Sequence, residues 1–460
     1  MFTLASLVTL ALSPVAAGPV TAPPASPTFG QQAEAPTVLF VRGERVYVRP
    51  DEVLENAAVL IQDGRILAVG KGLSAPKGAR ELEGKVVCAG FLDPWSGFGL
   101  DSESADDQRT TPATLTTDGL DLYTDSRLSL ELLAAGVTSL RLNAGASARE
   151  AGVGAVVRSH PGLGAEAVLL ADSCVATSIG ITREGRARDV FDALSEVDKL
   201  AGSIVDGGNY LRDKNEFKYE LEDWNKAIAE KEEELEKEFK EAKKDREKDE
   251  AEAEEKGKEY KPKKYKEDKR PSPPRFDEDK EVMGRVANGE LPLIVQVHRA
   301  AELRGLLQAT ERFDRLRLVI AGGTEAMTVA EELVERGIPV IVWPAPLGEG
   351  RPNELRAADL GLAGRLEDAG VQVLLGTGGR AQGSRELPLM AALAVGHGLT
   401  RRGAFEALTL GAARALDVAD RIGSLEGGKD ADLLIMDGEP LATTTRITHV
   451  ISNGDLVVGE

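Results

Sequence analysis

Short apolar runs alternate with helical runs through the middle of this 460-residue chain. The helical runs include residues 300–309 and 325–336, and the strand-like runs lie at residues 136–142, 291–297, 316–320, 338–343 and 371–375. Strand-helix alternation predicts a parallel sheet whose strands are joined by crossover helices. At this chain length a closed (β/α)8 TIM-like barrel, an α/β fold, is the most economical architecture.

Both ends of the chain carry the pattern of a small antiparallel sheet. Short β-like runs between residues 38 and 69 turn at Asp63-Gly64, and residues 423–437 and 448–458 repeat this character. Such runs, bounded by turn residues, are typical of strands. We therefore expect the two ends of the chain to join in one sheet module beside the barrel.

A charged helical insertion interrupts the barrel pattern at residues 205–285. This segment is dense in Lys and Glu, and its apolar residues follow three-, four- and seven-residue spacings at Leu221, Trp224, Ile228, Leu235, Phe239 and Ala242. The spacing predicts a long helix from Glu216 to Lys256 with a narrow apolar stripe. Two interpretations remain open: a solvated insertion packed weakly on the barrel, or a coiled-coil arm for a homo-oligomer or protein partner.

The first 36 residues have the pattern of an export signal followed by a tether. Residues 4–12 are apolar, and Pro14-Val15-Ala16-Ala17 supplies small residues suited to signal-peptidase cleavage after Ala17. The proline-rich residues 18–36 predict a disordered tether. Because the apolar run is too short to span a bilayer, we expect a signal peptide at residues 1–17, no membrane span, and a periplasmic or extracellular protein.

The formal net charge of −20 restricts the partners of the chain. A nucleic-acid-binding surface normally needs a basic face, so we expect no nucleic-acid partner and instead a small-molecule ligand or a protein. Cys88 and Cys174 are too few to form a disulfide framework. Cys88 lies inside a strand-like run, which predicts a buried thiol, and neither cysteine is assigned a catalytic role.

Five short motifs carry a family resemblance. They are Gly90-Phe91-Leu92-Asp93, Gly136-Val137-Thr138-Ser139, Gly323-Thr324-Glu325-Ala326, Ala412-Ala413-Arg414-Ala415-Leu416 and Lys429-Asp430-Ala431-Asp432-Leu433. Together they resemble the amidohydrolase superfamily, and most closely its imidazolonepropionase-like branch. The resemblance implies a barrel of residues 89–419 and a composite β-sandwich of residues 37–88 and 420–460. In active members, one or two divalent metals at the carboxyl mouth of the barrel activate water for C–N bond hydrolysis.

The metal-ligand positions that the resemblance implies are mostly occupied by other residues. The His-x-His pair of strand one falls on Trp95 and Gly97, the strand-six histidine on Gly322, and the strand-eight aspartate on Gly378. A catalytic zinc ion needs three protein ligands and a water, whereas glycine offers no ligand atom and indole only donates a hydrogen bond. We therefore expect no metal cofactor, or else zinc or another divalent metal held by unrecognised ligands.

On strand five His298 is the one retained metal-ligand candidate, and the strand-four ligand is not located. Three roles remain open for His298: a hydrogen-bonded core residue, a ligand contact or a metal ligand. The candidate lining residues of a pocket at the mouth are Trp95, Gln296, His298, Glu325 and Arg380. A different chemistry, with Ser96 or Thr377 as nucleophile, His298 as base and Asp93 nearby, is conceivable, but no sequence feature fixes its geometry.

Two functional hypotheses follow from the resemblance and its exceptions. In the first, the chain is a degenerate amidohydrolase-like protein that has lost metal-dependent hydrolysis and keeps a binding or scaffolding role. In the second, it is an active or weakly active hydrolase of non-peptide C–N bonds, such as cyclic amides, or of dipeptides. Residue chemistry favours the first hypothesis, because the loss of four ligand positions removes the means of activating water.

The N-terminal pattern generates a prediction about processing. Because the apolar run ends at Ala17, the mature protein should begin close to Gly18 and accumulate outside the cytoplasm. N-terminal sequencing of protein from fractionated cells measures both. Recovery of an intact Met1 from soluble cytosolic protein would contradict the prediction.

Overall fold

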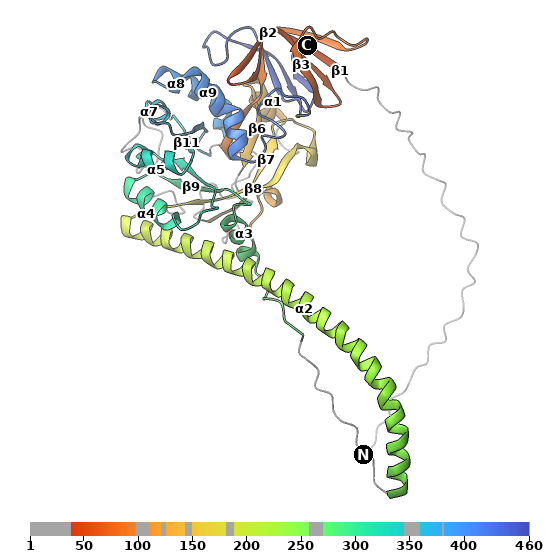
Figure 1. Ribbon diagram of the computed structural model, residues 1–460. Coiled ribbons are helices and arrows are strands. Elements are labelled where there is room, and N and C mark those ends of the chain that lie inside the picture. Colours follow the sequence, from red (N-terminus) through yellow and green to blue (C-terminus); the bar gives the residue numbers. More distant parts are fainter. Residues whose placement is uncertain are drawn as a thin grey trace, which may run out of the picture. The chain divides into compact units, whose positions relative to one another are not determined.

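The computed structural model describes residues 38–97, 111–120, 126–142, 150–180, 188–256, 270–344, 359–379 and 381–459 (Figure 1). The predicted signal peptide, the tether and Arg380 lie outside these residues. The described residues fold into a barrel-like sheet surrounded by helices and a second sheet made from the two ends of the chain. None of the described helices is both long enough and apolar enough to cross a membrane.

The central sheet has eight strands in the order β12-β11-β10-β9-β8-β7-β6-β5. They are β5 (Phe91–Ser96), β6 (Val137–Leu142), β7 (Glu150–Arg158), β8 (Val168–Ser178), β9 (Leu293–Val297), β10 (Leu318–Gly322), β11 (Val340–Val342) and β12 (Val373–Leu375). The predicted eight-stranded α/β barrel sheet is thus confirmed. Its two end strands also meet, because the Gly379 amide, just after β12, donates to the Trp95 carbonyl of β5 at 2.9 Å.

One strand departs from the expected all-parallel sheet. Strand β7 is antiparallel to both of its neighbours, β6 and β8, whereas the other pairs are parallel. A parallel connection needs a crossover of a dozen or more residues. Only residues 143–149 separate β6 from β7, and only residues 159–167 separate β7 from β8. These connections are too short for crossover helices, so the chain turns back instead.

The helices form the outer layer of the barrel. They are α1 (Ser126–Ala134), α2 (Val190–Lys256), α3 (Glu278–Ala287), α4 (Ala300–Thr310), α5 (Ala330–Glu335), α7 (Leu362–Asp368), α8 (Leu387–Gly396), α9 (Arg401–Leu408) and α10 (Leu410–Ala415). Alternate residues of each strand point to opposite faces. On β9, Leu293 and Val295 therefore pack in the layer between strands and helices, whereas Ile294 packs inside the barrel. The same alternation turns Gln296 and His298 toward the interior.

The two ends of the chain join in one seven-stranded sheet, as expected, in the order β15-β14-β13-β4-β1-β2-β3. Its strands are β1 (Val38–Arg49), β2 (Glu52–Gln62), β3 (Arg65–Lys71), β4 (Arg80–Ala89), β13 (Leu433–Met436), β14 (Ile447–Ser452) and β15 (Asp455–Val458). Strand β13 pairs with β4, so the C-terminal strands attach directly to the N-terminal ones. This sheet has a hydrophobic core of its own, which includes Val41, Val59 and Ile435.

Helix α2 is both a barrel helix and the predicted charged helix. It ends at Lys256, as predicted, but it begins at Val190 rather than at Glu216. Figure 1 shows its first half beside α3 and α4, and there Ala193, Val197 and Ile204 are buried. A Cβ atom at Gly207 would lie 2.4 Å from the Gly284 amide nitrogen of α3, so the two helix backbones touch.

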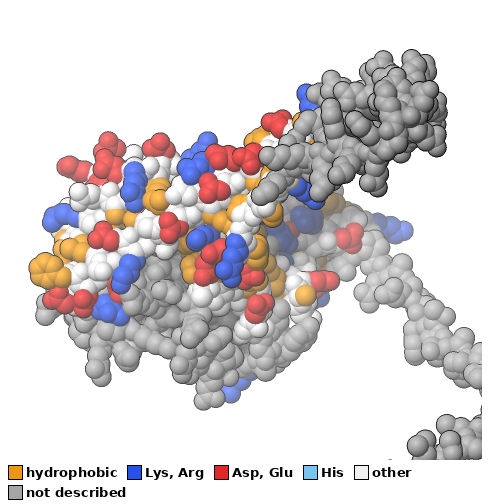
Figure 2. All heavy atoms as spheres, turned by 90° about the horizontal axis from the view of Figure 1, so that it is seen from below, with side chains coloured by type: hydrophobic (Ala, Val, Ile, Leu, Met, Phe, Trp, Pro, Cys, Tyr) orange, Lys and Arg blue, Asp and Glu red, His pale blue; other side chains and the backbone are white. Residues whose placement is uncertain are grey.

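Charge is mixed on the face of the molecule seen in Figure 2. Acidic and basic side chains are interspersed there with hydrophobic ones across the coloured residues. On α2 itself, Leu221, Trp224 and Ile228 are half-buried, and the residues between them are exposed. The structure describes no side chains of this helix beyond Ala229, so both interpretations of the stripe remain predictions.

The packing of α2 predicts that its distal part is dispensable for folding. Replacing residues 213–275 with a short Gly/Ser linker removes none of the buried residues up to Tyr210. The thermal midpoint should therefore move by a few degrees at most, equivalent to roughly 1 kcal/mol or less. As a control, Ile204→Ala should cost about 2–5 kcal/mol, because it opens a cavity under the same helix.

Differential scanning calorimetry measures these midpoints, and light scattering of the same proteins measures the oligomer mass. A deletion as damaging as Ile204→Ala would contradict the prediction. A lower mass after deletion supports the coiled-coil arm, and an unchanged mass supports the solvated insertion.

Candidate functional site

The carboxyl ends of the barrel strands place several of the predicted residues together. This end of a barrel is where enzymes of this architecture hold their reactive groups. Trp95 belongs to β5, Gln296 lies on β9 with His298 directly after it, and Trp343 directly follows β11. All but Trp343 are buried, with at most 3% of their surface exposed, and Trp343 is half-buried.

Aromatic and cationic side chains fill this end of the barrel. The Trp95 and Trp343 rings stack with their centroids 6.3 Å apart, and His298 meets Trp343 edge-on at 5.7 Å. The guanidinium carbon of Arg141, from β6, lies 4.9 Å from the centroid of the Trp95 ring, within the range of a cation–π interaction. Its Nε also donates to the Cys174 sulfur at 3.2 Å. We call Trp95, Arg141, His298 and Trp343 the aromatic cluster.

Two glycines lie against the rings of the aromatic cluster, and one of them makes room for a ring. A Cβ atom at Gly322 would lie 2.3 Å from Cε1 of His298, closer than nonbonded atoms approach. At Gly378 a Cβ would lie 3.4 Å from the Trp343 ring. Both glycines have positive φ angles, +87° and +75°, which other residues rarely adopt. The resemblance assigns metal ligands to both positions; here Gly322 accommodates the His298 ring, and Gly378 lies at ordinary contact distance from the Trp343 ring.

At the end of the fourth barrel strand, a serine side chain meets Gln296. Ser178 ends β8 and lies opposite Gln296 in the strand register. Its hydroxyl donates to Oε1 of Gln296 at 3.1 Å, and Nε2 of Gln296 lies 3.5 Å from Nε2 of His298. Strand four thus offers a hydroxyl rather than the lysine or glutamate that the resemblance implies.

These side chains do not form the ligand set of a hydrolytic metal centre. In the described part of the chain, no group of three or more His, Cys, Asp or Glu side chains is placed to hold a metal ion. The positions to which the resemblance assigns ligands on strands one, six and eight are Trp95, Gly97, Gly322 and Gly378, and none of these side chains can bind a metal ion. We therefore derive no catalytic step through a metal.

Asp93 binds the first barrel strand to the last. Its carboxylate is completely buried and accepts hydrogen bonds from the Thr377 amide at 3.2 Å, the Thr377 hydroxyl and the Ser384 hydroxyl at 2.8 Å. Burial raises the pKa of Asp93, and these hydrogen bonds oppose the rise by stabilising the charged form. The Ser96 hydroxyl lies 2.7 Å from that of Ser384.

The structure brings together only part of the arrangement in which Ser96 or Thr377 would be a nucleophile and His298 its base. Asp93, Ser96 and Thr377 do come together, and Ser384 of the 3-10 turn η4 (Ala381–Glu386) joins them. His298 instead contacts Trp343 and Gln296. Both Thr377 and Ser384 donate hydrogen bonds to Asp93, so these hydroxyls stabilise a buried carboxylate.

Glu325 lies at the rim of the same end of the barrel. Its carboxylate accepts a hydrogen bond from the Ala300 amide at the start of α4 at 2.7 Å, and its own amide donates to the His298 carbonyl at 3.0 Å. These bonds tie the segment after β10 to the segment after β9. Glu325 is half-buried and holds the two segments in place relative to each other.

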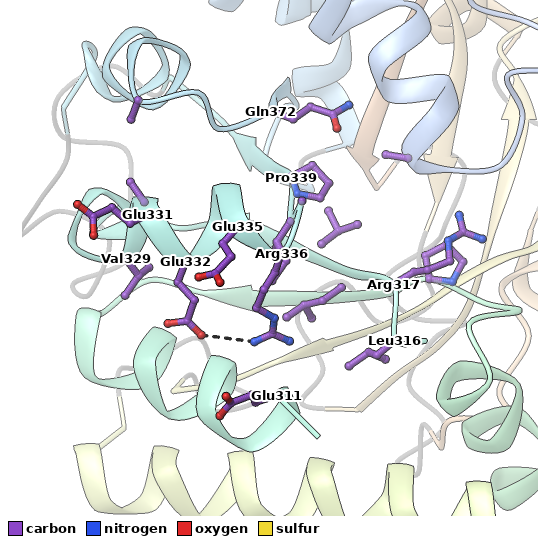
Figure 3. Close-up of a pocket in the computed structure, with 18 of the residues that line it drawn as sticks. Glu311, Leu316, Arg317, Val329, Glu331, Glu332, Glu335, Arg336, Pro339 and Gln372 are labelled. Atoms are coloured by element: carbon purple, nitrogen blue, oxygen red, sulfur yellow. Dashed lines mark hydrogen bonds and ion pairs between the residues drawn. The ribbon is translucent and has the colours of Figure 1, made fainter. Parts of the chain in front are cut away.

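A large groove lies away from the aromatic cluster, with a volume of about 1770 Å³ (Figure 3). Pro292, Arg317, Pro339 and Gln372, which directly precede β9 to β12, help to line it. Much of its charge is already paired: Arg336 with Glu332 at 3.5 Å, Arg317 with Asp417 at 2.7 Å, and Arg414 with Glu406 at 3.4 Å. It also lies at the amino ends of the strands, where conserved features usually serve stability.

Comparisons with known proteins agree with this fold. Residues 278–457 match the family model described as "Amidohydrolase family". A search of curated proteins finds no match. The chain is similar to the structure of an amidohydrolase from Thermotoga maritima MSB8, with a TM-score of 0.68 and 22% identity over 92% of this chain and all of that one.

Two further solved structures show the same fold at lower similarity. A Xaa-Pro dipeptidase with bound methionine in its active site matches with a TM-score of 0.52 and 15% identity, over 92% of this chain and 100% of that one. An ochratoxinase from A. niger matches with a TM-score of 0.50 and 18% identity, over 92% and 96% of the two chains. At these identities the similarity shows the amidohydrolase fold alone.

The fit between Gly322 and His298 generates a prediction. Gly322→Ala should destabilise the protein by about 2 kcal/mol or more, because it combines an unfavourable backbone angle with a clash against a buried ring. Gly396→Ala is the matched control: a Cβ at this helical glycine meets nothing within 4 Å, so stability should be unchanged or higher by about 0.5–1 kcal/mol. Chemical denaturation measures both, and equal stability of the two variants would refute the packing argument.

Proposed function

We propose that the chain is an exported member of the amidohydrolase superfamily, of its imidazolonepropionase-like branch, that has lost metal-dependent C–N bond hydrolysis and keeps a binding or scaffolding role. One observation supports this most directly. Trp95, Gly322 and Gly378 occupy positions at which the superfamily resemblance implies metal ligands, and Trp95 stacks on Trp343 while Gly322 lies directly against the His298 ring.

The chemistry of the cluster favours binding over hydrolysis. Lowering the pKa of a water molecule to about 7 requires a metal ion held with an open coordination position. An indole ring cannot coordinate a metal. The His298 ring contacts Trp343 and Gln296 and lies directly over Gly322. Trp95, Arg141 and His298 have at most 2% of their surface exposed, so the half-buried Trp343 ring is the part of the cluster that a ligand would contact.

A second candidate function is hydrolysis of non-peptide C–N bonds or of dipeptides. The observation that favours it is the match of residues 278–457 to the family model, together with similarity to structures described as an amidohydrolase and a Xaa-Pro dipeptidase. It requires zinc or another divalent metal bound by ligands outside those that the resemblance assigns.

Metal content separates the two candidates. We expect protein purified without chelators to contain well under one equivalent of zinc, manganese, iron or nickel per chain, measured by elemental analysis. Chelation should then leave the thermal midpoint unchanged, because no bound ion stabilises the folded state. Stoichiometric metal that is lost together with amidase or dipeptidase activity on chelation would overturn the proposal and establish the second candidate.

A further inference from the structure

A second cavity, distinct from the aromatic cluster, lies between β8, α2 and α3. Its volume is about 380 Å³, within the range of small-molecule sites. Val175 of β8 and Ile179, directly after β8, line it, and both belong to the hydrophobic layer outside the barrel sheet rather than to its interior. The cavity therefore lies on the outer face of strand four, under the two helices.

The base of this cavity is apolar. Val175, Ile179 and Met283 line it, and each has at most 3% of its surface exposed. Leu200 of α2 adds a half-buried side chain to the same lining. An apolar body seated there would be removed from water at about 25 cal/mol per Å² of buried apolar surface. The cavity thus suits the ring or alkyl part of an organic molecule.

The polar walls of the cavity are acidic. Glu196, Asp206, Asp277 and Asp279 line it, against Lys199 and Lys280. Among the residues that the structure describes, Glu196 pairs with Arg188 at 2.8 Å and Asp277 pairs with Lys280 at 3.7 Å. Asp279 accepts a hydrogen bond from the uncharged Ala113 amide at 3.1 Å. The remaining charged groups are the carboxylates of Asp206 and Asp279 and the ammonium group of Lys199, so the net charge of the walls is negative.

The start of α3 strengthens this preference for a cation. A helix N-terminus normally attracts anions through its free amides and its dipole. Here Asp277 caps the helix by accepting a hydrogen bond from the Lys280 amide at 3.1 Å. Glu278, Asp279 and Glu281 add negative charge in the first turn. The N-terminus is thus already compensated and would repel an anionic ligand.

We infer that this cavity binds a small organic cation: an amine or ammonium group carried on an apolar ring or chain. The apolar body packs on Val175, Ile179 and Met283, and the cationic group lies beside Asp206 and Asp279. The inference is independent of the proposed function, because it involves neither the aromatic cluster nor a metal.

Three probes that share one ring system test the chemistry. Tryptamine is cationic, tryptophol is its neutral alcohol counterpart, and indole-3-acetate is anionic. Saturation-transfer NMR and calorimetric titration of the full chain measure binding. We expect tryptamine to bind and indole-3-acetate not to bind. Tryptophol should bind about twofold to fivefold more weakly than tryptamine, as for loss of a solvent-exposed ion pair. Higher salt should weaken tryptamine binding.

Variants of exposed α2 residues locate the site without disturbing the core. Ser203 lines the cavity from the exposed face of α2, so Ser203→Trp should fill the space and abolish tryptamine binding. Asp206→Asn should weaken binding by about twofold to fivefold. Asp198→Asn, at another exposed acid of α2 that does not line the cavity, is the matched control and should leave binding unchanged.

Several outcomes would overturn the inference. These are the absence of tryptamine binding to the unmodified protein, equal or stronger binding of the neutral or anionic probe, and tryptamine binding that survives Ser203→Trp in a protein whose circular dichroism and thermal midpoint are unchanged. None of these results bears on metal content, so failure here is distinguishable from failure of the proposed function.

Discussion

The buried carboxylate of Asp93 is the constraint on which the barrel depends. A sheet of eight strands encloses an interior only if its first and last strands are held together. Asp93 does this from β5, because it accepts hydrogen bonds from Thr377, just after β12, and from Ser384 further along the chain. A carboxylate with no exposed surface is costly unless its oxygens are hydrogen-bonded. The cost of burying Asp93 is thus tied to closure of the sheet.

Once the barrel is closed, its carboxyl end must be filled. Protein interiors pack at the density of organic crystals, and here Trp95, Trp343 and the His298 ring occupy the space. The His298 ring requires the absence of a side chain at Gly322, because a Cβ there would lie 2.3 Å from its Cε1 atom. Gly322 and His298 are therefore coupled by packing. A side chain at position 322 would clash with the buried His298 ring unless that ring moved.

Much of the fold could be predicted from the sequence, because periodicity reports which residues share a face of a strand or helix. The end sheet, the parallel strands β9 to β12 and the end of α2 at Lys256 follow from such patterns. The antiparallel β7 and the start of α2 at Val190 do not. Strand direction depends on the length of the connections, and the buried first half of α2 lacks the charge density that marks its second half.

The candidate site was less predictable than the fold. Gln296, His298 and Trp95 were found through the resemblance, and the structure turns all three toward the interior. Arg141 and Trp343 were missed, although both occupy inward-facing positions of their strand patterns. A buried arginine is rare, so a lone Arg in an apolar strand is a signal that could have been used. Ser384 lies in an irregular segment with no periodic pattern, and only tertiary structure identifies it.

The Lys429–Leu433 motif stabilises the junction between the barrel and the end sheet. Asp430 and Asp432, from the Lys429–Leu433 motif, form buried ion pairs with Arg158 at the end of β7. Asp430 also binds Arg421 at 2.7 Å and Arg65 at 3.0 Å, so one carboxylate joins the barrel to the end sheet. Removing one partner of a buried pair typically costs about 3–5 kcal/mol. These ion pairs involve none of the residues of the aromatic cluster, so they stabilise the junction of barrel and end sheet whatever side chains occupy the mouth.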